Sequence, residues 1–588
     1  MKKKSFVLFC LLAGVIIFLS VCNNNQTITD VAANSTYSYV HLPQDVLPSC
    51  ILSQATFNSW FKTGKPTENG LVTPANSVTF GHFNNCEFYQ WSEQMFLWIT
   101  SQNTDMGGTV MESPLFYTVA PDSGKTLKLI KHVRGGVISA VSSLEKNGPN
   151  RLPVFRDKNG RLFEVQFHKP GEKVLVKNQS GQMIELGPVE KNANGLAVLK
   201  DKTGKTIEKP VFVSNLSNPE NVVHAFTTGQ GEIFLDENGN MLKGVSQATS
   251  DVLMSQTGSL VYYITMVNDM YAYFLSAVKD GYMARNQFPV TASARDRILT
   301  WARKKGYDPA PDSNALAIEI KTSWIIAENL TNQSSFVTMD AMVPTYAVSS
   351  KSKWIPNGQK KVKLALVGIH VVGSVADHPE MIWATFEHAS NVPNAAYQYI
   401  NNKNQVQTVA ADTGNWLFAS AAEKDFNISH MKVDTTTGDT ILAVKPYTIS
   451  ASSTQMKFPF GTAFNTRPNQ EDTSAAASNT QVISINNLIR SKLPGKDVRK
   501  NYLFIGATWT AGGTAPNGKV YSIDPTPGSA IGTSLLANST METYFQVNKY
   551  TCFTCHSGSN FLRPDSLSHI FSKIRPLTAT RMAITEKK

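Results

Sequence analysis

The sequence predicts an α+β multidomain protein with a β-rich central body, buried helices, a hairpin-rich β insertion and a short helical C-terminal segment. Three observations predict this class. Near-continuous apolar runs rich in β-branched residues, such as residues 362–372, are typical of strands that are covered on both faces. Short alternating runs separated by Asn-Gly and related turns fill residues 150–245. Apolar residues recur at helical spacing towards both ends of the chain.

The chain has 588 residues, enough for about two to four domains with at least one large core. Hydrophobic residues make up 42% of it and charged residues 17%, a composition that is typical of a globular protein and does not indicate a disordered or fibrous one. Without Lys2, Lys3 and Lys4 of the N-terminal segment, 52 basic and 44 acidic side chains give a formal net charge of +8. The basic residues are scattered and no nucleic-acid motif accompanies them, so we expect a solvated basic surface and no nucleic-acid partner. Attraction to an anionic membrane or an acidic protein partner is the alternative.

Residues 1–22 are typical of an export signal, because three lysines precede a long apolar run. Residues 19–22, LSVC, are similar to the lipobox of bacterial lipoproteins, in which Cys22 is lipidated and becomes the mature N-terminus. Val21 departs from the small residue usual at its position. Cleavage after Ala33 and an uncleaved membrane anchor are the alternatives. All three place the body outside the cytoplasm, in the periplasm or as a lipoprotein of the outer membrane or cell surface of a bacterium.

The first part of the exported chain is expected to be helical. Residues 23–45 are polar and predict a tether, and residues 46–149 predict a mainly helical N-terminal part. Within this part, an apolar stripe at helical spacing predicts a buried helix; its members are Phe88, Trp91, Met95 and Trp98.

Two cysteines, Cys50 and Cys86, lie outside both the export signal and the C-terminal motif. In an oxidising compartment such a pair predicts a disulfide. The bridge would close a loop of about 36 residues and contribute roughly 3–4 kcal/mol to stability. Two buried free thiols are the alternative.

Residues 150–245 predict a β-rich insertion of successive hairpins. Asn-Gly and related dipeptides provide the positive φ angles that tight turns need, and they interrupt alternating runs such as residues 162–167. The repeated pattern, for example Asp236-Glu237-Asn238-Gly239, also occurs in calcium loops, but the later carboxylate ligands of an EF-hand are missing.

Residues 246–510 predict an α+β core body. The apolar stretch 259–278 predicts a buried helix. Residues 315–320, 362–372 and 381–386 predict strands buried on both faces.

Residues 511–588 predict a loop followed by two short helices. Ser539 and Glu542 form a capping box, which predicts a helix over residues 539–547. An i, i+3, i+4, i+7 stripe predicts a second helix; its members are Leu567, Ile570, Phe571 and Ile574. The two helices bracket the pentapeptide at residues 552–556.

Cys552, Cys555 and His556 form the C-x-x-C-H arrangement that attaches a c-type haem. Each thiol can add to one haem vinyl group, and the adjacent histidine can ligate the iron from one face. A thioredoxin-type redox pair and half of a zinc site are the alternatives, but neither a βαβ pattern nor a second cysteine pair accompanies the motif. The sequence therefore predicts one covalent haem c, held by a C-terminal haem-binding segment. Only 32 residues follow His556, so the haem is expected to rest against the upstream body.

The sequence leaves the second axial ligand of the iron open. The candidates are Met582, His569, His388, His370 and His378. A thioether ligand from Met582 would raise the reduction potential. For the histidines, a hydrogen-bonded structural role is the alternative. Glu387, next to His388, is a candidate acid–base partner in a pocket.

Four stretches stand out as a set: residues 319–324 (EIKTSW), 368–372 (GIHVV), 383–393 (WATFEHASNVP) and 538–544 (NSTMETY). Together with the C-x-x-C-H they resemble a family of large, mostly uncharacterised bacterial cytochrome c family proteins that carry one C-terminal haem-attachment motif. The similarity spans roughly residues 310–575, with a weaker echo around Trp91, and does not include residues 150–245. It implies an exported haem protein and supplies no substrate.

Two functions are compatible with these patterns. In the first, the haem accepts single electrons and passes them on, with a redox partner protein or a small-molecule donor or acceptor. This function predicts two axial ligands, a low-spin iron and no open coordination position. In the second, the chain is a haem-dependent oxidoreductase of dehydrogenase or peroxidase type, whose large body binds an unknown substrate. A surface lipoprotein with a structural or sensory haem is a further alternative. Electron transfer is the main expectation, with catalysis left open.

Overall fold

The computed structural model describes residues 37–578 with gaps. The residues left out between these ends are 123–125, 142–149, 151, 153, 157–161, 170, 193–195, 217–218, 220–221, 229–230, 243–245, 248–250, 285–286, 435–438, 462–474, 518–525, 534, 547–551 and 557–563. The predicted export signal with Cys22, the residues around Ala33, and Met582 lie outside the described residues. In the described part the helices are α2 (Gln54–Trp60), α3 (Asn85–Ile99), α4 (Asp269–Lys279), α5 (Ala292–Lys304), α6 (Ala475–Lys492), α7 (Cys552–Cys555) and α8 (Pro564–Leu567).

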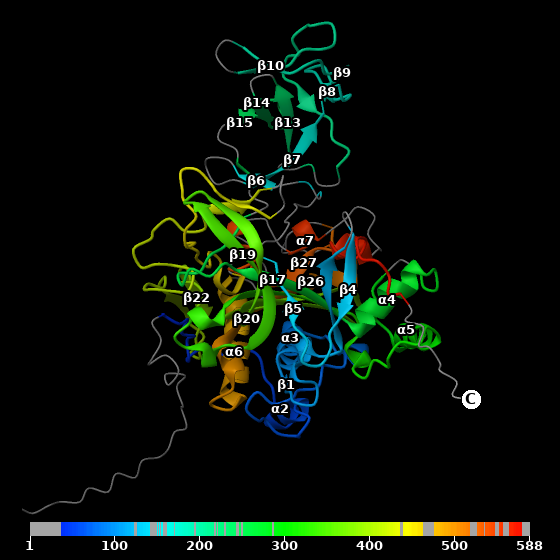
Figure 1. Cartoon of the computed structure of the whole chain (residues 1–588), viewed down its shortest axis with the longest axis vertical. Helices are drawn as coiled ribbons and strands as arrows, with labels where there is room; N and C mark the ends of the chain where they lie inside the picture. The colour runs from blue at the N-terminus through cyan, green and yellow to red at the C-terminus, as the bar shows by residue number, and fades with distance from the viewer. Residues whose placement is uncertain are drawn as a thin grey trace, which may run out of the picture.

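One large, mostly antiparallel sheet organises the body (Figure 1). Its main path is β27 (Ala530–Gly532), β26 (Tyr502–Thr510), β21 (His378–His388), β20 (Lys353–Val375), β18 (Ile318–Ile326), β17 (Tyr262–Asn268), β3 (Phe116–Pro121) and β4 (Leu127–Lys131). The strands β19 (Thr338–Ser350), β5 (Ile138–Ser139), β24 (Met431–Val433) and β25 (Ile441–Ala443) join the same sheet beside β20. The predicted strands over residues 315–320, 362–372 and 381–386 are confirmed as β18, β20 and β21, and the α+β class rich in strands is confirmed with them.

Different elements cover the two faces of this sheet. On one face, α3 and α6 pack, and Phe96 of α3 stacks on Phe386 of β21 with ring centres 4.3 Å apart. The predicted helix with the tryptophan stripe is α3, which begins with a capping box between Asn84 and Glu87. On the other face lie α4, α5 and the C-terminal segment, where the buried Phe571 contacts Phe274 of α4. The C-terminal segment is therefore part of a second core, built on the sheet.

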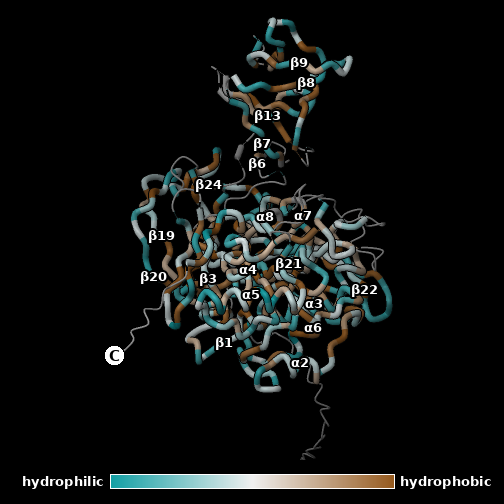
Figure 2. Tube along the Cα trace, turned by 90° about the vertical axis from the view of Figure 1, so that its right-hand side faces the viewer, coloured by the Kyte–Doolittle hydropathy of each residue, from teal (hydrophilic) through white to brown (hydrophobic). Residues whose placement is uncertain are grey.

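A smaller β-lobe, residues 154–247, stands on the body at the end where α7 lies (Figures 1 and 2). Its six-stranded sheet has the order β15 (Met241–Leu242), β14 (Gly231–Leu235), β13 (Val222–Thr228), β7 (Leu162–His168), β6 (Val154–Arg156) and β16 (Ser246–Gln247), and its three-stranded sheet has β12 (Val211–Phe212), β8 (Leu175–Lys177) and β9 (Met183–Glu185). Short two-stranded ribbons complete the chain: β1 (Gln102–Asn103) with β2 (Gly108–Thr109), β10 (Glu190–Lys191) with β11 (Ala197–Val198), and β22 (Tyr397–Ile400) with β23 (Val406–Val409). Hairpins are present as expected, but β7 and β13 pair in parallel, which a series of hairpins does not produce.

The buried helix expected over residues 259–278 was half wrong, because its first part is strand β17. Aromatic and β-branched side chains fill 261–265, and a strand in the middle of a sheet buries them on both faces. Asn268 then caps α4 by accepting the N–H of Tyr271. A strand and a helix that are both buried and directly joined give one continuous apolar run, so periodicity alone does not separate them.

Two expectations for the N-terminal part need correction. Residues 46–149 are helical only in their first half, since β3, β4 and β5 from the second half join the central sheet. The described end of the expected tether is not loose, because Val40 and Leu42 are buried and the N–H of Val40 donates to the carbonyl of Ala389. Cys50 and Cys86 form the expected disulfide, with Cα atoms 5.5 Å apart.

The two helices expected around the C-x-x-C-H are also shorter than the sequence indicates. Ser539 does not cap a helix, because its N–H and hydroxyl both donate to Glu387 of β21, and only a short 3₁₀ turn at Thr543–Phe545 follows. In the second stripe, α8 ends at Leu567, yet Leu567, Phe571 and Ile574 are all buried. Within the described ranges, none of the helices has the length and apolar character needed to cross a bilayer.

Candidate functional site

The C-x-x-C-H lies against the face of the central sheet that α4 and α5 also cover. Cys552 and Cys555 are the first and last residues of the four-residue helix α7, and neither sulfur is in a disulfide. Between them, Phe553 is fully buried, with its ring centre 5.8 Å from that of Trp383 in β21. Phe553 therefore fixes the short helix to the sheet while both cysteines stay partly exposed.

His556 is held on several sides. Its backbone N–H donates to the carbonyl of Cys552 at 2.9 Å, and its Nδ1 donates to the carbonyl of Leu567 at 2.7 Å. The imidazole lies between Trp383, with ring centres 4.3 Å apart, and His569, whose ring stacks on it at 4.1 Å. Burial, with His569 nearby, holds the pKa of His556 well below its ordinary value. His556 is thus a neutral imidazole with the proton on Nδ1, and its Nε2 makes no hydrogen bond to any of the residues that the structure describes.

Charged residues lie on the sheet beneath this motif. Lys321 of β18 stands directly opposite His370 of β20, and Nε2 of His370 lies 3.1 Å from both carboxylate oxygens of Glu542. Burial lowers the pKa of Lys321, while the charges of Glu542 and Glu319 oppose this. Lys321, His370 and Glu542 therefore form a partly buried charged cluster beside the cysteines, which we call the charged cluster.

The segment that leads into the motif is fixed to the same strands. The hydroxyl of Thr540 lies 2.6 Å from that of Ser323 in β18, and the amide of Asn538 donates to the hydroxyl of Thr385 in β21 at 2.9 Å. This close approach requires Gly368 of β20, because a Cβ there would lie 2.5 Å from the Thr540 hydroxyl. The four stretches that stand out in the sequence, in 319–324, 368–372, 383–393 and 538–544, thus meet on one sheet next to the C-x-x-C-H.

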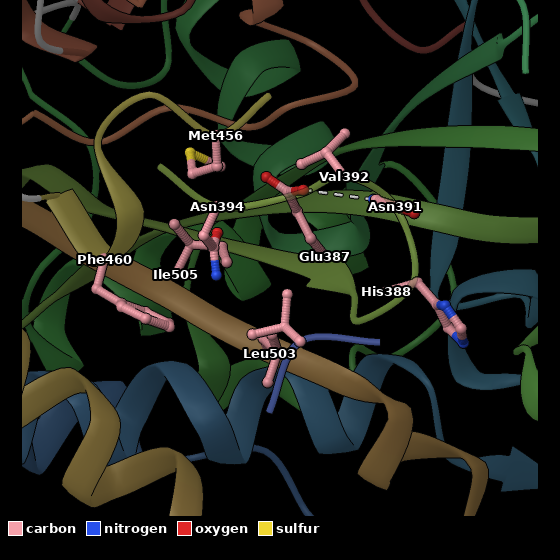
Figure 3. A pocket seen from close by; sticks show the side chains of 10 residues that line it. Glu387, His388, Asn391, Val392, Asn394, Met456, Phe460, Leu503 and Ile505 are labelled. Atoms are coloured by element: carbon pink, nitrogen blue, oxygen red, sulfur yellow. Dashed lines mark hydrogen bonds between the residues drawn. The ribbon is translucent and has the colours of Figure 1, made fainter. Parts of the chain in front are cut away.

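Glu387 belongs to this contact. It is buried and accepts the N–H of Ser539 at 2.6 Å, together with the Ser539 hydroxyl and the amide of Asn391. Burial raises its pKa to about 7, and the hydrogen bonds from Ser539 limit the rise. Figure 3 shows Glu387 with its bond to Asn391 in a small cavity that Met456 and Leu503 also line.

His388 points away from Glu387, so the two do not form the acid–base pair considered from the sequence (Figure 3). Its Nε2 donates to the carbonyl of Ser335 at 3.2 Å, its Nδ1 accepts from the hydroxyl of Ser390 at 2.8 Å, and its ring stacks on Phe336 at 3.8 Å. With both ring nitrogens engaged and 1% of the residue exposed, His388 is a structural histidine.

The other candidates for the second axial ligand are placed as follows. His569 stacks face to face on His556 and donates from Nε2 to the carbonyl of Cys555, whereas two axial ligands point their nitrogens at one iron from opposite sides. His378 is buried, with Nδ1 2.8 Å from Glu380. His370 alone of the candidates in the described part belongs to the charged cluster beside the motif. Met582 lies outside the described residues.

The two alternatives for the cysteine pair can be weighed against this geometry. Thioredoxin-type pairs rely on a thiol whose pKa is lowered, so that the thiolate forms. Burial raises the pKa of Cys552 here, and the nearby Glu542 raises it further. As to zinc, no group of three or more histidines, cysteines or acids that could hold a metal ion occurs in the described ranges.

Several residues of the site were missed from the sequence alone. Trp383 and Lys321 were seen only as parts of longer stretches, without roles, and Glu542 was seen only as part of a capping box. The charged side chains of Glu319 and Lys321 alternate with apolar ones inside β18. This alternation in a buried strand is the sequence pattern that could have identified them as site residues. The carbonyl of Leu567 has no signature in the sequence.

Comparison with known proteins returned no matching family model, no matching curated protein and no matching solved structure. The site is therefore interpreted from its own chemistry. Two thiols outside any disulfide, a neutral imidazole whose Nε2 makes no hydrogen bond to the described residues, and aromatic walls from Trp383 and Phe553 are groups that fit a covalent haem.

Proposed function

We propose that this chain is an exported c-type haem protein that binds one haem covalently and acts in electron transfer in the periplasm or at a membrane surface. Cys552 and Cys555 would form the thioether bonds, and His556 would be the proximal iron ligand. The observation that carries the proposal is the hydrogen bond from Nδ1 of His556 to the carbonyl of Leu567. A ligating histidine usually donates its second ring N–H to a carbonyl or carboxylate, which fixes the tautomer and leaves the other nitrogen for the metal.

The surroundings of the cysteines support the same function. When bound, a haem gains and loses single electrons at its iron. Trp383 and Phe553 supply flat apolar surface that excludes water from one side of the motif. The charged cluster supplies the ammonium of Lys321 and the carboxylate of Glu542 close to His556, and such charges adjust a reduction potential.

Export and partner choice are part of the proposal. Residues 1–22 have the pattern of an export signal, and the disulfide between Cys50 and Cys86 suits an oxidising compartment. A lipid on Cys22, or an apolar anchor, would hold the chain at a membrane. The partner would be a redox protein or a small-molecule electron donor or acceptor. The resemblance to large cytochrome c family proteins with one C-terminal C-x-x-C-H is a further argument for this class.

A haem-dependent oxidoreductase is the second candidate function, and the charged cluster is the observation that favours it. His370 and Glu542 are both partly exposed and share two close contacts, an arrangement that can exchange protons with a bound substrate. A protein that only transfers electrons does not need a pair of side chains that exchanges protons with a substrate. The two functions differ in whether the iron has an open coordination position.

Absorption spectroscopy of the exported full chain tests both functions. The proposal predicts a reduced spectrum with the sharp bands of a low-spin c-type haem, and no change when cyanide is added to the oxidised protein. A high-spin oxidised spectrum that responds to cyanide would instead support the oxidoreductase. A chain without any covalent haem, exported alongside a working haem-attachment system, would contradict both.

A further inference from the structure

Ser568 directly follows Leu567, whose carbonyl accepts the hydrogen bond from His556. Ser568 is 2% exposed, and its hydroxyl donates to Oε2 of Glu319 at 2.7 Å. The hydroxyl of Tyr271, in α4, lies 2.8 Å from the same Ser568 oxygen. The residue directly after Leu567, which carries the acceptor for His556, is thus fixed by two side chains of the body.

Glu319 is well placed to hold this segment. It lies in β18, in the middle of the central sheet, where it is paired with Val267 of β17 on one side and Val372 of β20 on the other. A carboxylate in a central strand has little freedom to move, so its oxygen is a fixed acceptor. Burial raises the pKa of Glu319, and the hydrogen bonds from Ser568 and Tyr271 oppose this rise.

The chain beyond Ser568 is fixed as well. Leu127 of β4 and Ile574 form a parallel bridge, the ammonium of Lys279 donates to the carbonyl of Ile574, and the N–H of Leu577 donates to the hydroxyl of Ser276. None of these contacts is made by the C-x-x-C-H itself. The segment 564–577, which we call the clasp, is therefore attached to the body independently of the motif, and it presents one carbonyl to His556.

We propose that Glu319, acting through Ser568, is a positioning residue that sets the orientation and hydrogen bonding of the His556 imidazole. The inference rests on the proposed function, because it treats His556 as the iron ligand. The path has three links: the Glu319 carboxylate accepts from Ser568, the peptide bond joins Ser568 to Leu567, and the Leu567 carbonyl accepts from His556. A firm acceptor at Nδ1 makes the other ring nitrogen a stronger donor to the metal and favours the oxidised iron.

Both variants act on the hydrogen bond from Ser568 to Glu319: Ser568→Ala removes it, and Glu319→Gln weakens it, because a neutral amide oxygen is a weaker acceptor than a carboxylate. Both are expected to raise the midpoint potential and to broaden or shift the electron paramagnetic resonance signal of the oxidised haem, because the imidazole loses its fixed acceptor. The double variant should shift no further than Ser568→Ala alone, since the two groups act in series. Ser568→Thr keeps the hydroxyl and should restore the wild-type potential and signal.

Glu93→Gln is the matched control. Glu93 is also a buried glutamate whose pKa is raised by burial, but it lies in α3, on the opposite face of the central sheet from the clasp. Its variant is expected to keep the wild-type haem signature, whatever it does to stability. If Glu319→Gln does not fold, the comparison of Ser568→Ala with Ser568→Thr still tests whether the Ser568 hydroxyl positions the His556 imidazole.

The outcomes separate the inference from the proposed function. A wild-type chain without covalent haem overturns the proposed function, and the inference with it. A wild-type chain with haem, whose potential and signal are unchanged in Ser568→Ala, overturns the inference alone. Additive shifts in the double variant would also overturn it, because they would show that Glu319 acts by charge rather than through Ser568.

Discussion

Nε2 of His370 lies 3.1 Å from both carboxylate oxygens of Glu542, which joins strand β20 to the segment that enters the C-x-x-C-H. Lys321 stands opposite His370 on the neighbouring strand, so a positive and a negative charge both lie near His556. Charges near a bound haem change the balance between its oxidised and reduced iron, so both side chains are expected to affect its reduction potential.

Lys321→Gln should lower the midpoint potential of the bound haem, and Glu542→Gln should raise it. Removing a positive charge stabilises the oxidised form, which carries the extra positive charge, and removing a negative charge does the opposite. Two unit charges about 10 Å apart interact by about 1.7 kcal/mol at an effective dielectric constant of about 20, so shifts of tens of millivolts are expected. Redox titration of both variants measures them, and shifts of the same sign would contradict the placement of the cluster.

Gly368→Ala should loosen the 538–542 segment, because the new Cβ would lie within 2.8 Å of Thr540, Ser323 and Asn538. We expect a loss of about 1–3 kcal/mol in the free energy of unfolding, together with an altered haem spectrum. Gly373→Ala, on the same strand, is the control, because its Cβ would meet Ile318 and Trp91 instead. It should lower stability by a similar amount and leave the spectrum unchanged; equal spectral effects in both would argue against the contact.

The Cys50–Cys86 disulfide links two residues that are 36 positions apart in the sequence. It joins the segment before α2 to α3. Replacing both cysteines with serine should lower the free energy of unfolding by roughly 3–4 kcal/mol, because the unfolded chain gains freedom. Urea denaturation with and without a reducing agent measures this. The reducing agent should destabilise the wild type and leave the double variant unaffected, and an equal response of both would show that the bond does not form.

His388 should make the fold sensitive to acid. Burial lowers its pKa to about 3, while an unfolded chain binds the proton near 6.5. The stability that neutral His388 contributes is therefore present above pH 6.5 and is lost as the pH falls from 6.5 towards 3, by up to about 1.4 kcal/mol per pH unit.

His388→Gln removes this titration, so the stability difference between wild type and variant should shrink as the pH falls. Urea denaturation at pH 7, 6 and 5 measures the difference, in which the other titrating groups cancel. A difference that stays constant over this range would show that His388 is not held neutral.

The sequence contained enough to predict much of the body. The runs that became β20 and β21 are apolar and β-branched because both of their faces are covered, and the stripe of α3 faces one core. Residues 262–268 were mistaken for helix because a buried strand runs straight into a buried helix there. Ser539 was mistaken for a helix cap because its hydroxyl is used by Glu387, 152 residues earlier, and long-range contacts of this kind override local signals.

The candidate site also combines residues that a local sequence motif reveals with contacts that only the fold creates. Cys552, Cys555 and His556 are adjacent in the chain, so a local pattern reveals them. The acceptor for His556 is a backbone carbonyl, which any residue can supply, and its support by Glu319 depends on two segments 249 residues apart. Such contacts follow from the packing of the sheet and the C-terminal segment, and no local pattern carries them.

The central claim is that one haem is attached through Cys552 and Cys555, and intact-protein mass spectrometry tests it most directly. The full chain would be exported in cells that contain a working system for haem attachment, with Cys552→Ala/Cys555→Ala as the matched variant. The account predicts that the wild type is heavier than its polypeptide by the mass of one haem, and that the variant has the polypeptide mass alone. A wild-type mass without haem, in cells where a control cytochrome c acquires its haem, would contradict the account.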